Sequence, residues 1–134
     1  DCDTVNAQAM FPVTPHLAIS PAANSMPATR KPAVVSTAVP GQAIVDAGMK
    51  AFTSYPPTPY GYCLEHPEVS IKGMSVEHGH MDITPSQHTF KVGEVLSFIP
   101  LHGGMTTNLY DRLYVLQNDE VVDTWEIAGR GRAQ

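Results

Sequence analysis

The chain contains few charged residues, few aromatic residues and only two cysteines. Charged residues make up 16% and aromatic residues 7% of the 134 positions, whereas charged residues usually account for about 25% of a globular chain. Two cysteines are too few for a disulfide scaffold. One disulfide between Cys2 and Cys63 is compatible with the sequence, and two buried free thiols are favoured. No apolar run reaches the roughly 18 residues that span a membrane, so no membrane partner is expected and the cytoplasm is the favoured location.

Basic residues are also scarce. Eight Lys and Arg against 13 Asp and Glu give a formal net charge of −5, and the basic residues are scattered. Nucleic-acid binding needs clustered cations, so no nucleic-acid partner is expected. The length suits one domain and is too short for a complete (β/α)8 barrel, which needs roughly 250 residues. The first residue is Asp rather than Met, which indicates a chain that was processed, truncated or excised from a longer one.

Proline, in contrast, is abundant in the first half of the chain. There are 12 prolines, and residues 12–32 combine five of them with many Ala, Ser and Thr. Proline at such intervals blocks helix formation. We therefore expect residues 1–33 to form an extended Pro-rich N-terminal arm that is ordered only where another surface holds it. A floppy tail is the alternative.

From residue 33 onward the sequence is typical of short β-strands separated by turns. We expect strands within residues 33–39, 42–47, 69–77 and 90–99, with a bulge at Gly73. The clearest hairpin joins residues 112–117 to 120–127 through Asn118 and Asp119. Only residues 4–10 or 45–52 could hold a short helix. The sequence predicts a mainly β fold, a small β-barrel or sandwich, over residues 34–134.

Histidines and carboxylates gather in two places. Residues 77–82 read Glu-His-Gly-His-Met-Asp, and His102 follows a predicted strand. Imidazole and carboxylate suit zinc or another divalent ion, so His78, His80 and His102 could form a metal site. The alternative is that each histidine is exposed or hydrogen-bonded structurally.

A second group of polar residues follows His102. Gly103 and Gly104 permit a close backbone approach, and Asn108, Tyr110 and Asp111 then offer an amide, a phenol and a carboxylate. This pattern is typical of the rim of a site. The alternative is a polar connection between strands with Tyr110 packed in the core. No nucleophile motif or phosphate-binding loop is present, so no catalytic residue is assigned.

Five motifs occur in a fixed order between residues 34 and 132: PGQAIVDAGMKA at 40–51, SVEHGH at 75–80, VGEV with IPLH at 92–102, TNLYD at 107–111, and VVDTW with RGR at 121–132. In this order they resemble the C-terminal β domain of D-threonine aldolases and D-serine dehydratases. These enzymes are alanine racemase-like, fold type III pyridoxal-phosphate enzymes.

The resemblance implies a pyridoxal-phosphate lyase that acts on D-β-hydroxy amino acids, with a divalent metal such as zinc or manganese near the cofactor. In the family the relevant strand ends in Pro-x-His-x-Asp or Pro-x-His-x-Cys. His102 keeps the first ligand, while Gly104 occupies the usual second-ligand position and offers no side chain; His80 is a further candidate. The resemblance also implies a substrate-facing rim with these four residues: Glu77, His78, Tyr110 and Asp111.

The resemblance leaves the cofactor-binding barrel unaccounted for. None of the four lysines, which are Lys31, Lys50, Lys72 and Lys91, matches the Schiff-base lysine of the family. The sequence therefore favours the β-domain portion of a lyase that needs a barrel-bearing chain. A stand-alone binding or structural module, in which the arm pairs with another copy of the chain, is the alternative. Either form would be an oligomer, and the first would meet a small amino acid as substrate.

Overall fold

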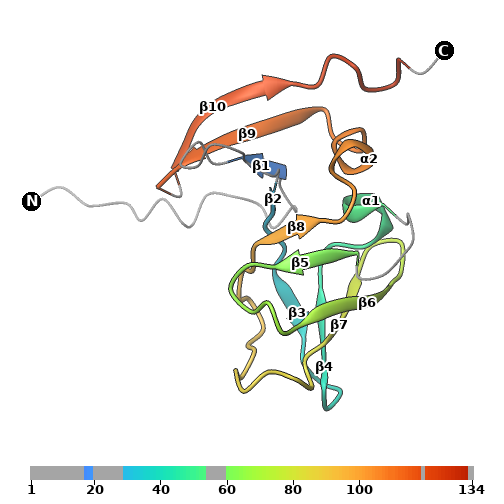
Figure 1. Cartoon of the computed structure of the whole chain (residues 1–134), viewed down its shortest axis with the longest axis vertical. Helices are drawn as coiled ribbons and strands as arrows, with labels where there is room; N and C mark the ends of the chain where they lie inside the picture. The colour runs from blue at the N-terminus through green and yellow to red at the C-terminus, as the bar shows by residue number, and fades with distance from the viewer. Residues whose placement is uncertain (1–16, 20–28, 54–59, 119, 133–134) are drawn as a thin grey trace, which may run out of the picture.

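The computed structural model describes residues 17–19, 29–53, 60–118 and 120–132, and the chain is mainly β (Figure 1), as predicted. It contains two short helices, α1 (Met49–Phe52) and α2 (Gly103–Thr107). The strands are β1 (Leu17–Ile19), β2 (Thr29–Arg30), β3 (Val34–Ser36), β4 (Gln42–Val45), β5 (Gly61–Cys63), β6 (Ser70–Met74), β7 (Gly79–Asp82), β8 (Phe98–Pro100), β9 (Arg112–Gln117) and β10 (Glu120–Glu126).

The strands form one sheet in the order β10-β9-β1-β2-β8-β5-β6-β7-β4-β3. Arg30 of β2 pairs with Phe98, and the same antiparallel ladder continues to Val34 of β3, whose N–H donates to the Glu94 carbonyl (2.8 Å). β3 thus extends the line of β2 while it pairs with β4 at the far end of the sheet. This double pairing curls the sheet into a half-barrel (Figure 1).

One apolar core fills the curl. Alternate residues of β4 and β7 are buried, among them Val45 and Met81, as expected for strands with one face inward. Phe52 of α1 meets Phe98 of β8 edge to face, with ring centroids 5.8 Å apart. Burial of each large side chain contributes roughly 1.5–3 kcal/mol, so Phe52 fixes α1 firmly against the sheet.

Several local predictions are confirmed. β9 and β10 form the predicted hairpin, with Asn118 at φ 53° in the turn. The register of β6 against β7 shifts between Ile71 and Gly73, which is the predicted bulge. Cys63 is a buried free thiol whose pKa is raised to about 11, chiefly because burial disfavours the thiolate. Cys2 lies outside the described residues.

Two described strands fall within the range predicted as an N-terminal arm. β1 pairs antiparallel with β2 and parallel with β9, and β2 pairs with β8. The boundary at residue 33 stays a prediction, and residues 1–16 and 20–28, which include the predicted helix at 4–10, lie outside the described residues. Neither α1 nor α2 has the length or the apolar character needed to cross a membrane.

Candidate functional site

Helix α1 makes hydrogen bonds to both of the segments that carry the predicted rim residues. The Met49 N–H donates to the carbonyl of Ser75 (3.0 Å), at the turn between β6 and β7. On the other side, the Tyr110 hydroxyl donates to the carbonyl of Ala51 (3.1 Å). Figure 1 shows α1 and α2 next to each other beside the sheet. The turn that holds Glu77 and His78 and the segment that holds Tyr110 are therefore both fixed to α1.

Close packing at Gly48 makes this arrangement possible. Gly48 precedes α1, and a Cβ atom there would collide with backbone atoms of Ser75, Glu77 and His78. Only a residue without a side chain allows α1 to approach the β6–β7 turn this closely.

The predicted rim residues on either side of α1 already have partners in the fold. Glu77 forms an exposed ion pair with Lys50 of α1. The backbone N–H of His78 donates a hydrogen bond to the Ser75 hydroxyl in the same turn (3.2 Å). Tyr110 is half-buried, and burial raises the pKa of its hydroxyl to about 12 although Arg30 acts in the opposite sense. Tyr110 is thus a neutral hydrogen-bond donor near pH 7.

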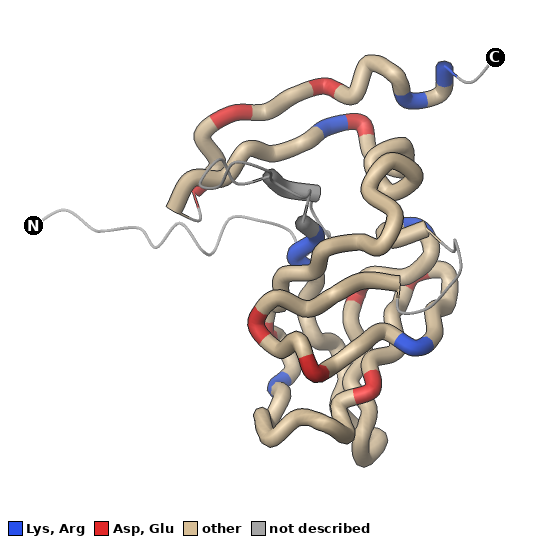
Figure 2. The backbone as a smooth tube through the Cα atoms, viewed as in Figure 1, with Lys and Arg blue, Asp and Glu red and all other residues tan. Residues whose placement is uncertain are grey.

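Asp111 lies in an open, polar hollow of about 590 Å³ between the start of β9 and the segment after β10. Asp111 pairs with Arg130, and Arg112 approaches Glu126 at 4.0 Å. Arg132 also lines the hollow. Figure 2 shows charged residues along both strands of the hairpin and in the segment after it. Three guanidinium groups against two carboxylates leave one excess positive charge at this exposed surface.

His102 caps the N-terminus of α2. Its Nδ1 accepts a hydrogen bond from the Met105 N–H (3.3 Å), which assigns the proton of the neutral ring to Nε2. A Cβ atom at Gly104 would lie 3.9 Å from Cε1 of the His102 ring. A side chain at position 104 would therefore stand beside the imidazole.

Comparison with known proteins decides the family. A family model described as "Putative serine dehydratase domain" matches residues 31–116. The chain belongs to this family. The predicted resemblance to D-threonine aldolases and D-serine dehydratases is confirmed.

The relatives of this D-serine dehydratase-like domain differ in length. The D-threonine aldolase of Arthrobacter sp. is 35% identical over 100 residues, which cover 73% of this chain and 25% of the relative. An uncharacterized protein of Mycobacterium tuberculosis is 30% identical over 92 residues, which cover 66% of this chain and 69% of the relative. The crystal structure of D-threonine aldolase from Filomicrobium marinum matches with a TM-score of 0.69 and 25% identity over 80% of this chain and 29% of that chain. The chain thus spans about a quarter of the Arthrobacter aldolase.

The described residues do not fit a pyridoxal-phosphate site. A Schiff-base lysine has to reach the cofactor inside an enclosed pocket. The Lys50 side chain is 69% exposed and pairs with Glu77, Lys72 and Lys91 are exposed, and Lys31 is half-buried next to β2. In the portion of this family domain that the structure describes, no lysine occupies such a pocket.

The two-ligand metal site that the family implies does not fit either. His102 uses its Nδ1 lone pair to cap α2, and Gly104 supplies no second ligand. His80 lies on the outer side of β7, opposite Ile44 and Gly73. The described residues do not bring His78, His80 and His102 within reach of one ion.

A different set of potential ligands comes together elsewhere in the described part of the domain: His66, His88 and Glu94. Nothing in the sequence points to them, because they come from two different loops and their intervals match no ligand motif. Only the fold reveals that these loops meet.

Proposed function

We propose that the chain is the β-domain portion of a pyridoxal-phosphate-dependent lyase, of the D-threonine aldolase or D-serine dehydratase type, that acts on D-β-hydroxy amino acids and needs a barrel-bearing chain for activity. The proposal rests on how much of this chain the family match covers and how little of a full-length relative the chain covers. The family match spans residues 31–116 of this chain, whereas the aligned region makes up 25% of the Arthrobacter D-threonine aldolase.

In such an enzyme the cofactor, when bound, supplies the electron sink for the chemistry at the amino-acid α-carbon. The residues of this chain would line the entrance to the active site and set the charge around it. Tyr110 and Glu77 are held on either side of α1 by the Ala51 carbonyl and by Lys50. The hollow around Asp111, with its excess of arginine, would attract the substrate carboxylate. The residues of this chain would therefore bind and orient the substrate.

A complementation assay tests this function. The barrel portion of the Arthrobacter D-threonine aldolase, expressed without its own β domain, is mixed with the chain, and consumption of D-threonine and D-serine is measured. We expect turnover in the mixture and none with either component alone. Re-addition of the aldolase's own β domain is the positive control. If that domain restores activity and this chain does not, the proposal is wrong.

A specific observation favours a second candidate, a stand-alone binding or structural module. The 92 residues aligned with the M. tuberculosis relative make up 69% of that protein, so the relative is about as long as this chain. The hairpin of β9 and β10 would also offer a surface to another copy, because β10 is exposed along its length and Trp125 is 49% exposed. A module of this kind is expected to self-associate through the predicted arm. A chain that stays a monomer in both dilute and concentrated solution would exclude it.

A further inference from the structure

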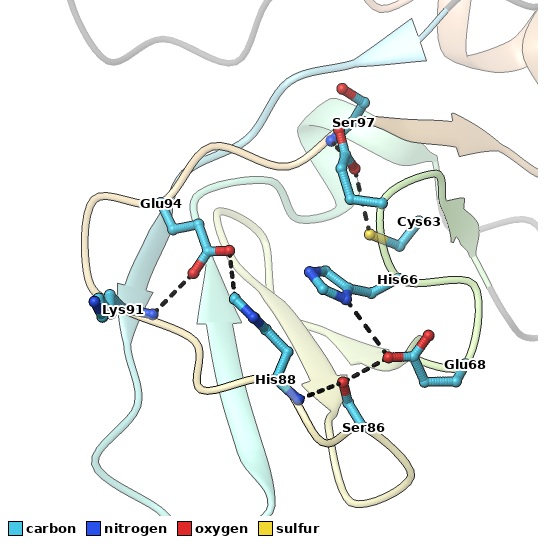
Figure 3. A network of polar contacts seen from close by, with 9 residues as sticks. Cys63, His66, Glu68, Ser86, His88, Lys91, Glu94 and Ser97 are labelled. Carbon is cyan, nitrogen blue, oxygen red and sulfur yellow. Dashed lines mark hydrogen bonds and ion pairs between the residues drawn. The ribbon is translucent and has the colours of Figure 1, made fainter.

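Three potential metal ligands from two loops converge at the side of the sheet near the start of β6. His66 lies in the loop between β5 and β6, and His88 and Glu94 lie in the long connection between β7 and β8. One nitrogen of each ring and one carboxylate oxygen lie within 4.8 Å of one another. Figure 3 shows the three side chains pointing toward one another. In the described part of the chain this is the only such group of three.

The spacing suits a small transition-metal ion. His88 Nε2 lies 2.8 Å from Glu94 Oε1, and the rings of His66 and His88 stack with centroids 4.4 Å apart. Around tetrahedral zinc, ligands at about 2.0–2.1 Å are separated from one another by about 3.4 Å. The separation of His88 from Glu94 would have to grow by about 0.6 Å and the other separations to shrink by up to about 1.4 Å, with one imidazole rotating out of the stack, to bring the three atoms to that distance. Two imidazoles and one carboxylate are a common zinc ligand set, and they leave a fourth position for water.

Neighbouring groups hold the ligands in this orientation. Glu68 Oε1 lies 3.5 Å from Nδ1 of His66, which directs the other ring nitrogen away from Glu68. A carboxylate behind a histidine is the usual partner of a metal-bound imidazole. The Ser86 hydroxyl donates a hydrogen bond to Glu68 Oε1 (2.5 Å) and accepts one from the backbone N–H of His88 (3.1 Å). These contacts are drawn in Figure 3.

Glu94 and the two rings are fixed on their remaining sides as well. The second carboxylate oxygen of Glu94 accepts the Lys91 N–H (3.0 Å). Phe90 meets both imidazoles edge-on, at centroid distances of 5.0 Å for His66 and 4.7 Å for His88. The side chains remain accessible, with exposed fractions of 20%, 39% and 24% for His66, His88 and Glu94. An ion could therefore enter from solvent without a change in the fold.

We propose that His66, His88 and Glu94 bind one divalent transition-metal ion, with zinc preferred, at a site separate from His102. The ion would join the β5–β6 loop to the β7–β8 connection and stabilise the folded chain, because an ion that binds only the folded state shifts the unfolding equilibrium.

The test uses the full chain after removal of metal by a chelator. Zn²⁺ content is measured after dialysis, and Co²⁺ is titrated as a spectroscopic probe. Variants His88→Ala and Glu94→Gln each remove one ligand, and His102→Ala is the matched control at the other histidine. We expect one Zn²⁺ per chain and a weakening of more than about tenfold in both ligand variants, since even loss of an outer-shell contact costs about 10–100-fold. The control should bind as the unaltered chain does.

Imidazole NMR resonances provide a second measurement that needs no variant to fold. Addition of Zn²⁺ should shift the resonances of His66 and His88 and leave those of His78, His80 and His102 in place. The proposal is overturned if the chain does not retain Zn²⁺ or if only the His102 resonance shifts. It is also overturned unless both ligand variants lose Zn²⁺ binding and the His102→Ala control keeps it.

Discussion

The guanidinium group of Arg30 lies over the ring of Tyr110, 4.1 Å from its centroid. The two residues are far apart in the sequence, and Tyr110 in turn donates to the Ala51 carbonyl. This stack therefore connects β2, α1 and the segment that leads into β9. Arg30 is fully buried, and its Nε, Nη1 and Nη2 have no hydrogen-bond partner among the described residues.

Replacement of Arg30 by methionine should leave the free energy of unfolding unchanged or raise it by up to about 2 kcal/mol. Burial lowers the pKa of Arg30 to about 10, although Tyr110 and Asp46 act in the opposite sense, so the cation that is present near pH 7 opposes folding. Substitution of a buried charge by an apolar residue of similar size is often neutral or stabilising by about 1–4 kcal/mol, while the lost cation–π contact is worth about 0.5–2 kcal/mol. Urea unfolding measures the change. A loss of more than about 1 kcal/mol would show that Arg30 has a stabilising partner.

Tyr110 should make stability depend on pH in the alkaline range. Burial raises its pKa from 10.0 to about 12, so the folded state keeps a proton that the unfolded state releases. This contribution is fully present below pH 10 and is lost as pH rises from 10 to 12. We expect a decline of about 1–2 kcal/mol after allowance for solvent screening. Because the lowered pKa of Arg30 acts with the opposite sign over the same range, the test is the difference between two chains measured by urea unfolding. The stability of Tyr110→Phe should gain about 1–2 kcal/mol on that of the unaltered chain between pH 10 and 12; parallel curves would contradict the assignment.

Gly48→Ala should destabilise the fold at the α1 contact. The added methyl group would meet the backbone of the β6–β7 turn, and overpacking of this kind costs about 1–3 kcal/mol or more. Gly103→Ala is the matched control, because a Cβ there meets nothing within 4 Å and alanine is favoured over glycine in a helix by up to about 1 kcal/mol. Thermal unfolding should therefore shift in opposite directions in the two variants. Equal shifts would show that α1 does not rest on the turn.

Gly104→Asp should supply a second ligand beside His102, and metal binding there would take the Nδ1 lone pair from the cap of α2. The new carboxylate would stand next to the imidazole, since a Cβ at position 104 lies 3.9 Å from the ring. The variant is made in a His88→Ala background, so that the cluster at the other loops does not contribute. Isothermal titration with Mn²⁺ and Zn²⁺ should show binding at least about tenfold tighter than in the background. Gly103→Asp carries the same charge without facing the ring, and equal binding by that control would contradict the geometry.

Features that depend on neighbouring residues could be predicted from the sequence. The hairpin at Asn118 and the bulge at Gly73 both follow from strand patterns interrupted by turn-forming or small residues. Helix α2 could not be predicted, because Gly103 and Gly104 are poor helix formers. The cap at His102 and the bond from the Thr106 hydroxyl to the Phe52 carbonyl (2.9 Å) hold it in place.

Features that depend on how distant segments meet required the structure. The continuation of β2 into β3, which curls the sheet, depends on a ladder with residues 94–98. The cluster of His66, His88 and Glu94 likewise arises only when two loops fold against each other. The family resemblance placed Glu77 and Tyr110 on the predicted rim, but the sequence did not indicate that both residues contact α1.

Native mass spectrometry of the particle purified from its source, combined with its visible absorption spectrum, tests the central claim most directly. If the chain is the β-domain portion of a pyridoxal-phosphate lyase, the particle will contain a cofactor-bearing barrel, on the same polypeptide or on a second one in fixed ratio, and will show Schiff-base absorbance. A particle made of this chain alone, as a monomer or as multiples of itself and without the cofactor, would contradict the account.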